Sequence, residues 1–174
     1  MKTLILMRHA KSDWSGSELA DHDRPLNARG QETAERLAAF LKEQAIKPSR
    51  ILCSTARRAR DTLAPILAAY DAPPVVDYDE RLYMATAPRL LKIVQGLSNA
   101  DDMVLVIGHN PGLHALALAL AMGPTDGDRQ AHQDLANKFP TGAMAILRFS
   151  TDSWRKVDPH CGALADFIRP KAFA

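Results

Sequence analysis

Two histidines of this chain each follow a short apolar run of the length of a β-strand. His9 comes after residues 4–7 and Arg8, and His109 comes after residues 104–107 and a glycine. In open α/β sheets ligands bind at the carboxyl ends of the strands, so we expect both imidazoles at one edge of a sheet. One Arg-His pair alone is equally well explained as a polar strand end that meets solvent. The second histidine favours a functional site.

Arg8 gives His9 a specific chemistry. A guanidinium beside an imidazole disfavours the protonated imidazole, which keeps His9 a neutral nucleophile or base near pH 7. The same cation attracts anions, because guanidinium groups bind phosphate oxygens in a bidentate manner. The pair therefore predicts phosphoryl transfer to His9.

Three arginines, Arg57, Arg58 and Arg60, lie where a helix is expected to begin after a strand over residues 51–53. Helix N-termini favour acidic side chains, so a basic first turn is unfavourable unless an anion binds there. A hydroxyl side chain just before the helix is expected to cap it. Adjacent side chains in this turn point about 100° apart, so only one of the three arginines can aim squarely into a pocket. A solvated basic turn is the alternative for each of them.

Taken in order along the chain, Arg8-His9, the turn from Ser54 to Arg58 and His109 resemble the motifs of the histidine phosphatase superfamily, also called phosphoglycerate-mutase-like. The most similar branch is that of the SixA-like phosphohistidine phosphatases. The resemblance covers nearly the whole chain. It implies that His9 is the phosphate acceptor and that Arg8, Arg58 and His109 complete the phosphate pocket. The register of the family thus selects Arg58 from the three arginines.

Three further positions gain a meaning from the same resemblance. Arg24, in an Arg-Pro-Leu segment, is implied as a further phosphate contact. Ala10 stands where the family usually has glycine, and this departure reduces backbone freedom. Glu80 lies where mutase-like members carry a glutamate general acid, although an exposed loop carboxylate beside Arg81 has equal weight. A phosphohistidine substrate needs such an acid less, because a protonated imidazole leaves easily.

Length and composition predict one domain over residues 1–174, with a core of ordinary size. The net charge of +2 argues against nucleic acid or an anionic membrane as the main partner. Two cysteines are too few for a disulfide framework, and the first residues are too short an apolar run for a signal peptide, so a cytoplasmic protein is expected. Neither a metal site nor a cofactor is predicted, since the histidines and cysteines lack ligand spacing. The oligomeric state is not predicted.

The elements that must position these residues alternate between strand and helix. This pattern predicts an α/β fold with a mainly parallel sheet flanked by helices on both faces, as in phosphoglycerate-mutase-like proteins, and a late antiparallel hairpin. The expected strands are 3–7, 51–53, 104–107 and the hairpin pair 143–149 and 154–157; the expected helices are 30–44, 56–70, 88–96 and 112–122. Asn110 is expected to cap the last helix, with Pro111 at its first position. Residues 123–140 are expected to form an irregular surface segment.

These observations favour a phosphohistidine phosphatase that forms a covalent phosphohistidine on His9 without a metal, and whose partner is a phosphorylated protein. A small-molecule phosphomonoesterase or a phosphoglycerate-mutase-type enzyme would use the same pocket, with a small phosphate ester as substrate. A non-catalytic phosphate-binding module is the third alternative, disfavoured because binding alone gives no reason for a nucleophile beside Arg8.

Overall fold

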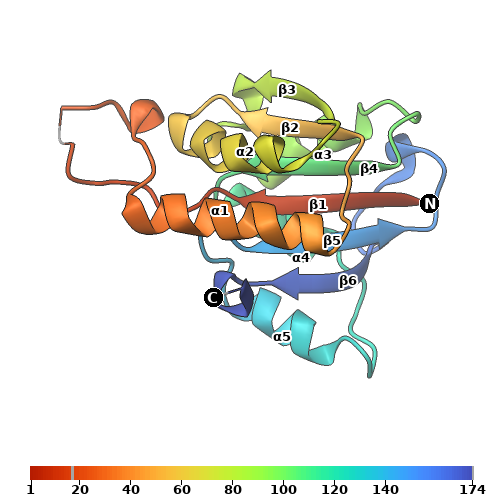
Figure 1. The fold of residues 1–174 in the computed structure, drawn as a ribbon. Helices are drawn as coiled ribbons and strands as arrows, with labels where there is room; N and C mark the ends of the chain where they lie inside the picture. Colours follow the sequence, from red (N-terminus) through yellow and green to blue (C-terminus); the bar gives the residue numbers. More distant parts are fainter. Residues whose placement is uncertain (17, 174) are drawn as a thin grey trace.

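In the computed structural model, which describes residues 1–16 and 18–173, the described strands form one sheet in the order β3-β2-β4-β1-β5-β6 (Figure 1). Strands β1 to β4 are parallel, whereas β5 is antiparallel to β1 and β6 is antiparallel to β5. The bounds are β1 Lys2–Arg8, β2 Arg50–Ser54, β3 Val75–Asp79, β4 Met103–Gly108, β5 Met144–Phe149 and β6 Ala163–Ile168. The expected α/β fold, with its mainly parallel sheet and late antiparallel pair, is confirmed.

Helices cover both faces of this sheet (Figure 1). Side chains alternate along each strand, so Ile5 and Met7 pack with α1 and α2, while Leu4 and Leu6 pack with α3 and α4 on the other face. All nine residues from Leu4 to Ser12 except Arg8 and Lys11 are buried, which makes β1 the centre of the core. The helices are α1 Ala28–Glu43, α2 Arg57–Ala69, α3 Ala87–Gln95, α4 Gly112–Leu120 and α5 Arg129–Asn137.

The sequence predictions for the last third of the chain are partly wrong. Residues 154–157 do not form the second hairpin strand: Trp154–Lys156 is a 3-10 turn, and β6 pairs with β5 instead. The apolar side chain of Trp154 suggested a strand, but it is buried by that turn, where its indole N–H donates to the Asp101 carbonyl at 2.7 Å. Residues 123–140 contain α5, whose apolar face is short: Leu135 is its buried residue, and Ala131, one turn earlier, packs against the core.

Two predicted helix caps are also wrong, because their side chains have other partners. Asn110 does not cap α4: its Nδ2 donates to the Phe139 carbonyl at 2.9 Å, and the helix begins at Gly112. Ala56 occupies the N-cap of α2 without a side-chain hydrogen bond. Ser54 Oγ instead accepts the Ala56 N–H at 3.2 Å. Both polar side chains are thereby held at the end of the sheet where the strands β2 and β4 stop.

Glycine is required at the start of α4, where the helix approaches the segment after β3. A Cβ built on Gly112 would lie 1.8 Å from the Ala85 carbonyl oxygen, whereas a Cβ on Gly123 would meet nothing within 4 Å. We expect Gly112→Ala to lower the free energy of unfolding by about 3 kcal/mol, because the backbone at Ala85 or at the start of α4 must move to make room for the added methyl group. Gly123→Ala should change it by less than about 0.5 kcal/mol. Urea unfolding measures both, and equal effects of the two substitutions would contradict this close approach.

Two further features of the fold concern a cysteine and the helix lengths. Cys53 is fully buried on β2, and burial raises the pKa of its thiol to about 12. Among the described residues, no helix combines the length and the hydropathy needed to cross a membrane.

Candidate active site

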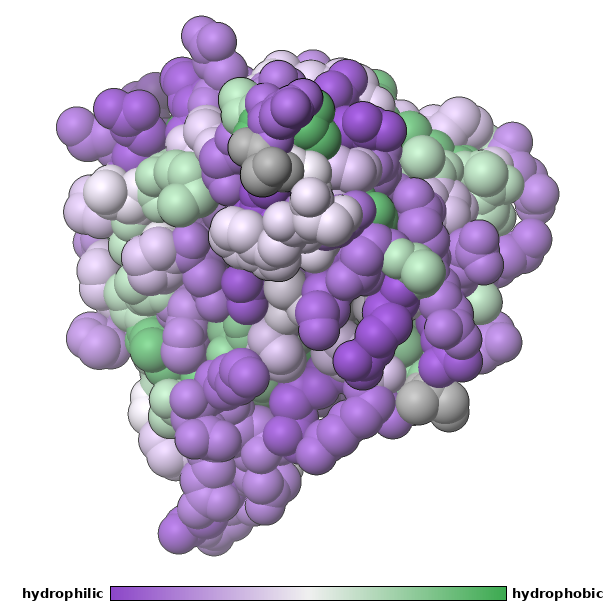
Figure 2. Space-filling view, turned by 90° about the vertical axis from the view of Figure 1, so that its left-hand side faces the viewer, coloured by the Kyte–Doolittle hydropathy of each residue, from purple (hydrophilic) through white to green (hydrophobic). Residues whose placement is uncertain are grey.

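A pocket of about 440 Å³ lies at the carboxyl ends of β1 and β4. Arg8, His9, Arg24, Arg58 and His109 all line it. The face of the molecule at this end of the sheet is dominated by hydrophilic side chains, with apolar ones scattered among them (Figure 2). The structure therefore brings together five of the six residues that the sequence analysis selected.

The register of the sheet explains why the two histidines meet. Arg8 of β1 is paired with Gly108 of β4, so the next residue on each strand emerges at the same edge. The rings of His9 and His109 lie 5.1 Å apart between centroids and are inclined by 52°. Both are nearly buried, with 5% and 3% of their surfaces exposed. The prediction that two strand ends deliver their histidines to one place is confirmed.

Hydrogen bonds define the tautomer of His9. Its Nδ1 lies 2.7 Å from the Ala10 carbonyl oxygen. A carbonyl only accepts, so Nδ1 carries the proton and Nε2 keeps its lone pair. The Arg58 Nε–H points at this lone pair from 3.3 Å. Nε2 is therefore an unprotonated nitrogen that faces a guanidinium.

The surroundings of His9 also keep its ring neutral. Burial lowers the pKa of His9 to about 3, and the guanidiniums of Arg58, Arg8 and Arg24 add to this effect against the opposing hydrogen bond to Ala10. Burial likewise lowers the pKa of His109 to about 3, helped by His9 and Arg58. Both imidazoles are thus unprotonated near pH 7.

These lowered pKa values predict a pH dependence of stability. Between about pH 3 and pH 6.5 the unfolded chain binds protons at these histidines that the folded protein does not bind. The free energy of unfolding should therefore fall as the pH is lowered through this window, by up to about 1.4 kcal/mol per pH unit for each histidine. Urea unfolding at about pH 7 and about pH 5.5 measures the slope. The double variant His9→Gln/His109→Gln should have a smaller slope than the wild type, whereas the control His160→Asn, at an exposed site, should keep the wild-type slope. An equal slope in the wild type and both variants would contradict the assignment of the pH dependence to His9 and His109.

Arg58 is the one arginine of the basic turn that enters the pocket. It is 3% exposed, and its Nη1 donates to the Asp21 carbonyl at 2.7 Å while its Nη2 donates to an Asp21 carboxylate oxygen at 3.1 Å. Arg57 and Arg60 are exposed, and Arg57 Nε lies 3.7 Å from Asp61 Oδ2. The placement expected from the helical angle is confirmed.

Arg8 and Arg24 present guanidiniums from two other segments. Arg24 is buried, and its Nη1 donates to Ser12 Oγ at 2.8 Å. Its guanidinium stacks on the Trp14 ring at 3.6 Å from the centroid. Arg8 donates one bond to the Phe139 carbonyl at 3.2 Å, but its buried Nε has no partner among the described residues. An unpartnered buried N–H in this pocket is suited to an anionic ligand.

His109 has one bonded and one unpartnered ring nitrogen. Its Nε2 lies 2.7 Å from Ser54 Oγ, which already accepts the Ala56 N–H. The Ser54 hydroxyl can therefore donate to Nε2, which leaves the proton on Nδ1. This buried Nδ1 finds no partner in the described part of the chain. In that tautomer His109 offers a second free N–H to an anion.

Glu80 is the one selected residue that the structure does not bring to the pocket. It opens a 3-10 turn (Glu80–Leu82) after the edge strand β3, and its side chain is exposed. It is not among the residues that line the pocket. The segment after β3 does reach the site three residues later, at Tyr83, so it is the outward direction of the Glu80 side chain that keeps this carboxyl out of the pocket.

Two residues of the site, Asp21 and Tyr83, were not predicted from the sequence. The Asp21 carboxylate accepts hydrogen bonds from Arg24 Nε and Nη2 at 3.0 and 2.9 Å, and from the Tyr83 hydroxyl. Tyr83 packs edge-on against the His109 ring, with 5.3 Å between centroids. An acidic residue three positions before Arg24 was the available signal for Asp21. No local signal pointed to Tyr83, which lies 62 residues from Asp21.

Ala10 is accommodated without strain. It is fully buried, and its N–H donates to Thr62 Oγ1 at 2.9 Å. The described non-glycine residues with positive φ are Ala45, Met84 and His160, so Ala10 has an ordinary backbone conformation. Gly142, with a φ of 77°, donates its N–H to the carbonyls of both Arg8 and His9 at 3.0 Å. The positive φ beside the Arg-His pair is thus at Gly142, where a glycine tolerates it.

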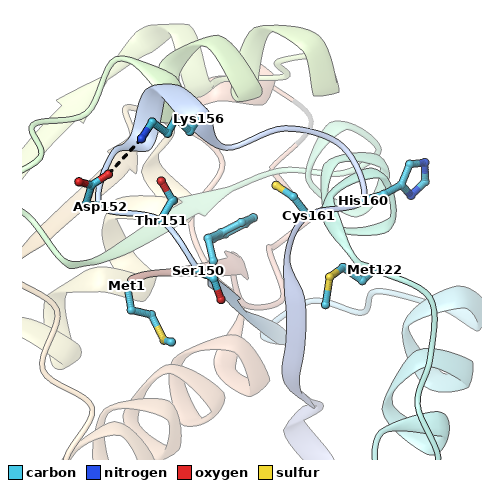
Figure 3. A pocket seen from close by; sticks show the side chains of 9 residues that line it. Met1, Met122, Ser150, Thr151, Asp152, Lys156, His160 and Cys161 are labelled. Carbon is cyan, nitrogen blue, oxygen red and sulfur yellow. Dashed lines mark hydrogen bonds and ion pairs between the residues drawn. The ribbon is translucent and has the colours of Figure 1, made fainter.

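A larger, open pocket of about 820 Å³ lies at the opposite end of β1 (Figure 3). Met1, Met122, Ser150, Thr151 and Cys161 are among its lining residues. Lys156 is ion-paired with Asp152 at 3.4 Å. Because no arginine is among the described residues that line this pocket, the smaller pocket around His9 is the better candidate for anion chemistry.

Comparisons with known proteins agree with this geometry. A family model described as histidine phosphatase superfamily (branch 1) matches residues 4–83. The chain is also 38% identical over 165 residues to an uncharacterized protein of Mycobacterium tuberculosis, an alignment that covers 95% of this chain and 100% of that protein.

Two solved structures extend the similarity over the fold. One is a protein of Nakamurella multipartitia assigned as phosphohistidine phosphatase SixA, with a TM-score of 0.81, 29% identity and coverage of 97% of this chain and 96% of that one. The other is a protein of Agrobacterium tumefaciens with the same assignment, with a TM-score of 0.80, 28% identity and coverage of 97% and 98%. From its motifs, its fold and these relatives, the chain belongs to the histidine phosphatase superfamily, branch 1.

Proposed function

We propose that this protein is a phosphohistidine phosphatase that carries the phosphoryl group on His9 Nε2 during turnover. The observation that carries the proposal is the state of His9: a neutral imidazole whose proton is held at Nδ1 by Ala10 and whose Nε2 lone pair faces Arg58. Such a nitrogen is a nucleophile that needs no base to activate it. The similarity to two proteins assigned as phosphohistidine phosphatase SixA supports the same conclusion.

In the first step His9 Nε2 attacks phosphorus, and the P–N bond of the substrate breaks. The electron pair of that bond stays on the leaving nitrogen. If the second nitrogen of the substrate ring carries a proton, the product is a neutral imidazole. The guanidiniums of Arg8, Arg24 and Arg58 and the N–H of His109 would neutralise the phosphoryl oxygens in the transition state, so the charge is balanced without a metal ion.

In the second step a water molecule attacks the phosphorus of phosphorylated His9. The bond from phosphorus to Nε2 breaks, inorganic phosphate is released, and His9 returns to its neutral tautomer. The hydrogen bond from Nδ1 to the Ala10 carbonyl is compatible with both states, because Nδ1 keeps its proton throughout. His9 therefore does not have to rotate between the two steps.

The lack of a protonated carboxylic acid among the described residues that line the pocket favours a P–N bond over a P–O bond in the substrate. An ester leaves as an alkoxide unless an acid protonates it. Glu80 does not line the pocket, and the Tyr83 hydrogen bond, with the two arginines, holds the pKa of the Asp21 carboxyl well below its usual range. Asp21 is thus ionised and cannot serve as that acid. A protonated phosphoimidazole has no such need.

The mouth of the pocket supports a protein as the carrier of the phosphoryl group. Trp14 and Met84 line the pocket and are exposed, and Lys11 and Lys138 on the same rim are exposed as well. An open site of this kind is suited to a phosphoryl group presented on the surface of another macromolecule, which itself excludes water. A phosphohistidine-bearing protein is therefore the proposed partner.

Substrate competition tests this proposal. We expect kcat/KM for a phosphohistidine-bearing protein to exceed that for 3-phosphoglycerate or a sugar phosphate by at least tenfold, about 1.4 kcal/mol in transition-state binding. Phosphate release measured under one set of conditions gives both constants. A value of kcat/KM that is tenfold higher for a small phosphate ester would establish the phosphomonoesterase or mutase alternative. Binding of phosphorylated protein without turnover would establish the phosphate-binding module.

A further inference from the structure

Asp21 places a carboxylate where an anion pocket would not be expected to have one. It lines the pocket between Arg24 and Arg58, the residues assigned to the phosphoryl oxygens. The side chains of both arginines are buried, at 9% and 4% exposed, whereas 47% of the Asp21 side chain is exposed. The Asp21 carboxylate therefore contacts buried guanidinium donors on one side and is exposed at the mouth of the pocket on the other.

Four hydrogen bonds hold this carboxylate in place. Oδ1 accepts two bonds from Arg24, at 3.0 and 2.9 Å, and Oδ2 accepts one from Arg58 at 3.1 Å and one from the Tyr83 hydroxyl. A purely local ion pair would need only the arginine three residues away. The partners from α2 and from the segment after β3 orient the group from three directions, so its negative charge has a defined position.

The charge of the pocket follows from this placement. The guanidiniums of Arg8, Arg24 and Arg58 and the ammonium groups of Lys11 and Lys138 make the pocket cationic, while His9 and His109 are neutral. Asp21 carries the one carboxylate among the described residues that line the pocket, so its negative charge is the one that a phosphoryl donor meets there. A donor with a further negative charge near the exposed side of Asp21 would be repelled by this carboxylate, whereas a donor with a cationic leaving group would be attracted to it.

We propose that Asp21 is a specificity-determining residue, whose carboxylate selects phosphoryl donors with a protonated, cationic leaving group and rejects donors with an additional anion beside the phosphoryl group. This inference rests on the proposed function. The negative charge of the carboxylate stabilises the positive charge of a phosphoimidazolium ring at its exposed side, which favours the protonated donor. The P–N bond then breaks with its electron pair on the leaving nitrogen, the N–H stays on the other nitrogen, and a neutral imidazole departs.

The test compares Asp21→Asn with Asp23→Asn, which removes an exposed carboxylate two residues away that does not line the pocket. Asparagine keeps the size and one acceptor but not the charge. For Asp21→Asn we expect the ratio of kcat/KM for free phosphohistidine to that for 3-phosphoglycerate to fall at least tenfold. Asp23→Asn should keep the wild-type ratio within about twofold. A decrease of both constants by the same factor in Asp21→Asn would show a structural role only and would overturn the inference.

Two further measurements separate this inference from folding and from the proposed function. Asp21→Glu keeps the charge and should keep most of the ratio; a Glu variant that folds but behaves as Asn does would also overturn the inference. Competitive inhibition of p-nitrophenyl phosphate turnover by orthophosphate and by pyrophosphate does not depend on phosphohistidine. Asp21→Asn should lower the inhibition constant of pyrophosphate by a factor at least five times larger than the factor by which it lowers that of orthophosphate. If wild-type enzyme does not turn over phosphohistidine, the proposed function fails, whereas unchanged relative inhibition would contradict the role of Asp21.

Discussion

Replacing His9 by alanine is expected to lower kcat by about 10⁴-fold or more, because the attacking nitrogen is lost and water must attack the substrate directly. The same change should abolish a phosphoenzyme. Wild-type protein that is quenched during turnover of labelled substrate should hold phosphate in a bond that is stable in base and labile in acid, as a phosphoimidazole is. Phosphate release by stopped assay and trapping after denaturation measure the two effects.

A matched substitution controls for the loss of a histidine as such. His22 also lies beside the site, where its Nε2 is 2.9 Å from Thr55 Oγ1, but it does not line the pocket. His22→Ala should trap as much phosphate as the wild type. Undiminished turnover by His9→Ala, or a phosphorylated residue other than His9 in the wild type, would contradict the covalent mechanism.

Arg58→Ala is expected to lower kcat by about 10³-fold, on the scale seen when a guanidinium that stabilises phosphoryl transfer is removed. Arg58 contacts both His9 Nε2 and Asp21, so its loss removes transition-state charge and also frees the nucleophile to move. The effect should appear in kcat more than in KM, because the charge on the phosphoryl oxygens shifts in the transition state. Steady-state kinetics with one substrate measures it.

The neighbouring arginines are internal controls for this prediction. Arg57→Ala and Arg60→Ala remove the same charge from the same helical turn, but both side chains are exposed. Each should lower kcat by less than about threefold, since the charge of an exposed side chain is largely screened by solvent. If Arg57→Ala were the crippling change and Arg58→Ala were mild, the assignment of the phosphate contacts would be wrong.

Much of the site could be predicted because the signals are local in the sequence. Apolar runs that end in His9 and His109 place both rings at one sheet edge, and the pairing of Arg8 with Gly108 makes them neighbours. The helical angle allows only one arginine of the basic turn into the pocket, and that arginine is Arg58. The strand period and the helical angle limit the possibilities, and the resemblance to the family selects Arg58 among the three arginines.

The parts of the site that sequence reasoning missed depend on contacts through space. Asp21 and Tyr83 meet across 62 residues, and neither belongs to a periodic pattern. Glu80 has the right residue type at the family position, but its side chain points into solvent at the end of an edge strand. Residue type alone does not give the direction of a side chain.

The fold was predicted less well where apolar residues are not periodic. Trp154 and Val157 are buried by a 3-10 turn, which looks like half of a hairpin in the sequence. Helix α5 has only a short apolar face, made by Ala131 and Leu135, which is too little to distinguish it from a surface loop in the sequence. The sheet order was beyond reach, because nothing local indicates that β4 lies between β1 and β2.

The burial of Cys53 has a consequence for oxidative stress. Phosphatases that use a thiolate nucleophile lose activity when peroxide converts it to a sulfenic or higher acid, since a low pKa and exposure make such a thiol reactive. Here the proposed nucleophile is a ring nitrogen, and the thiol nearest to it in the sheet is fully buried, with a pKa of about 12. The reaction that we assign to this pocket would therefore continue in an oxidising cell, so that dephosphorylation by this protein is separated from the redox signals that silence thiol-based phosphatases.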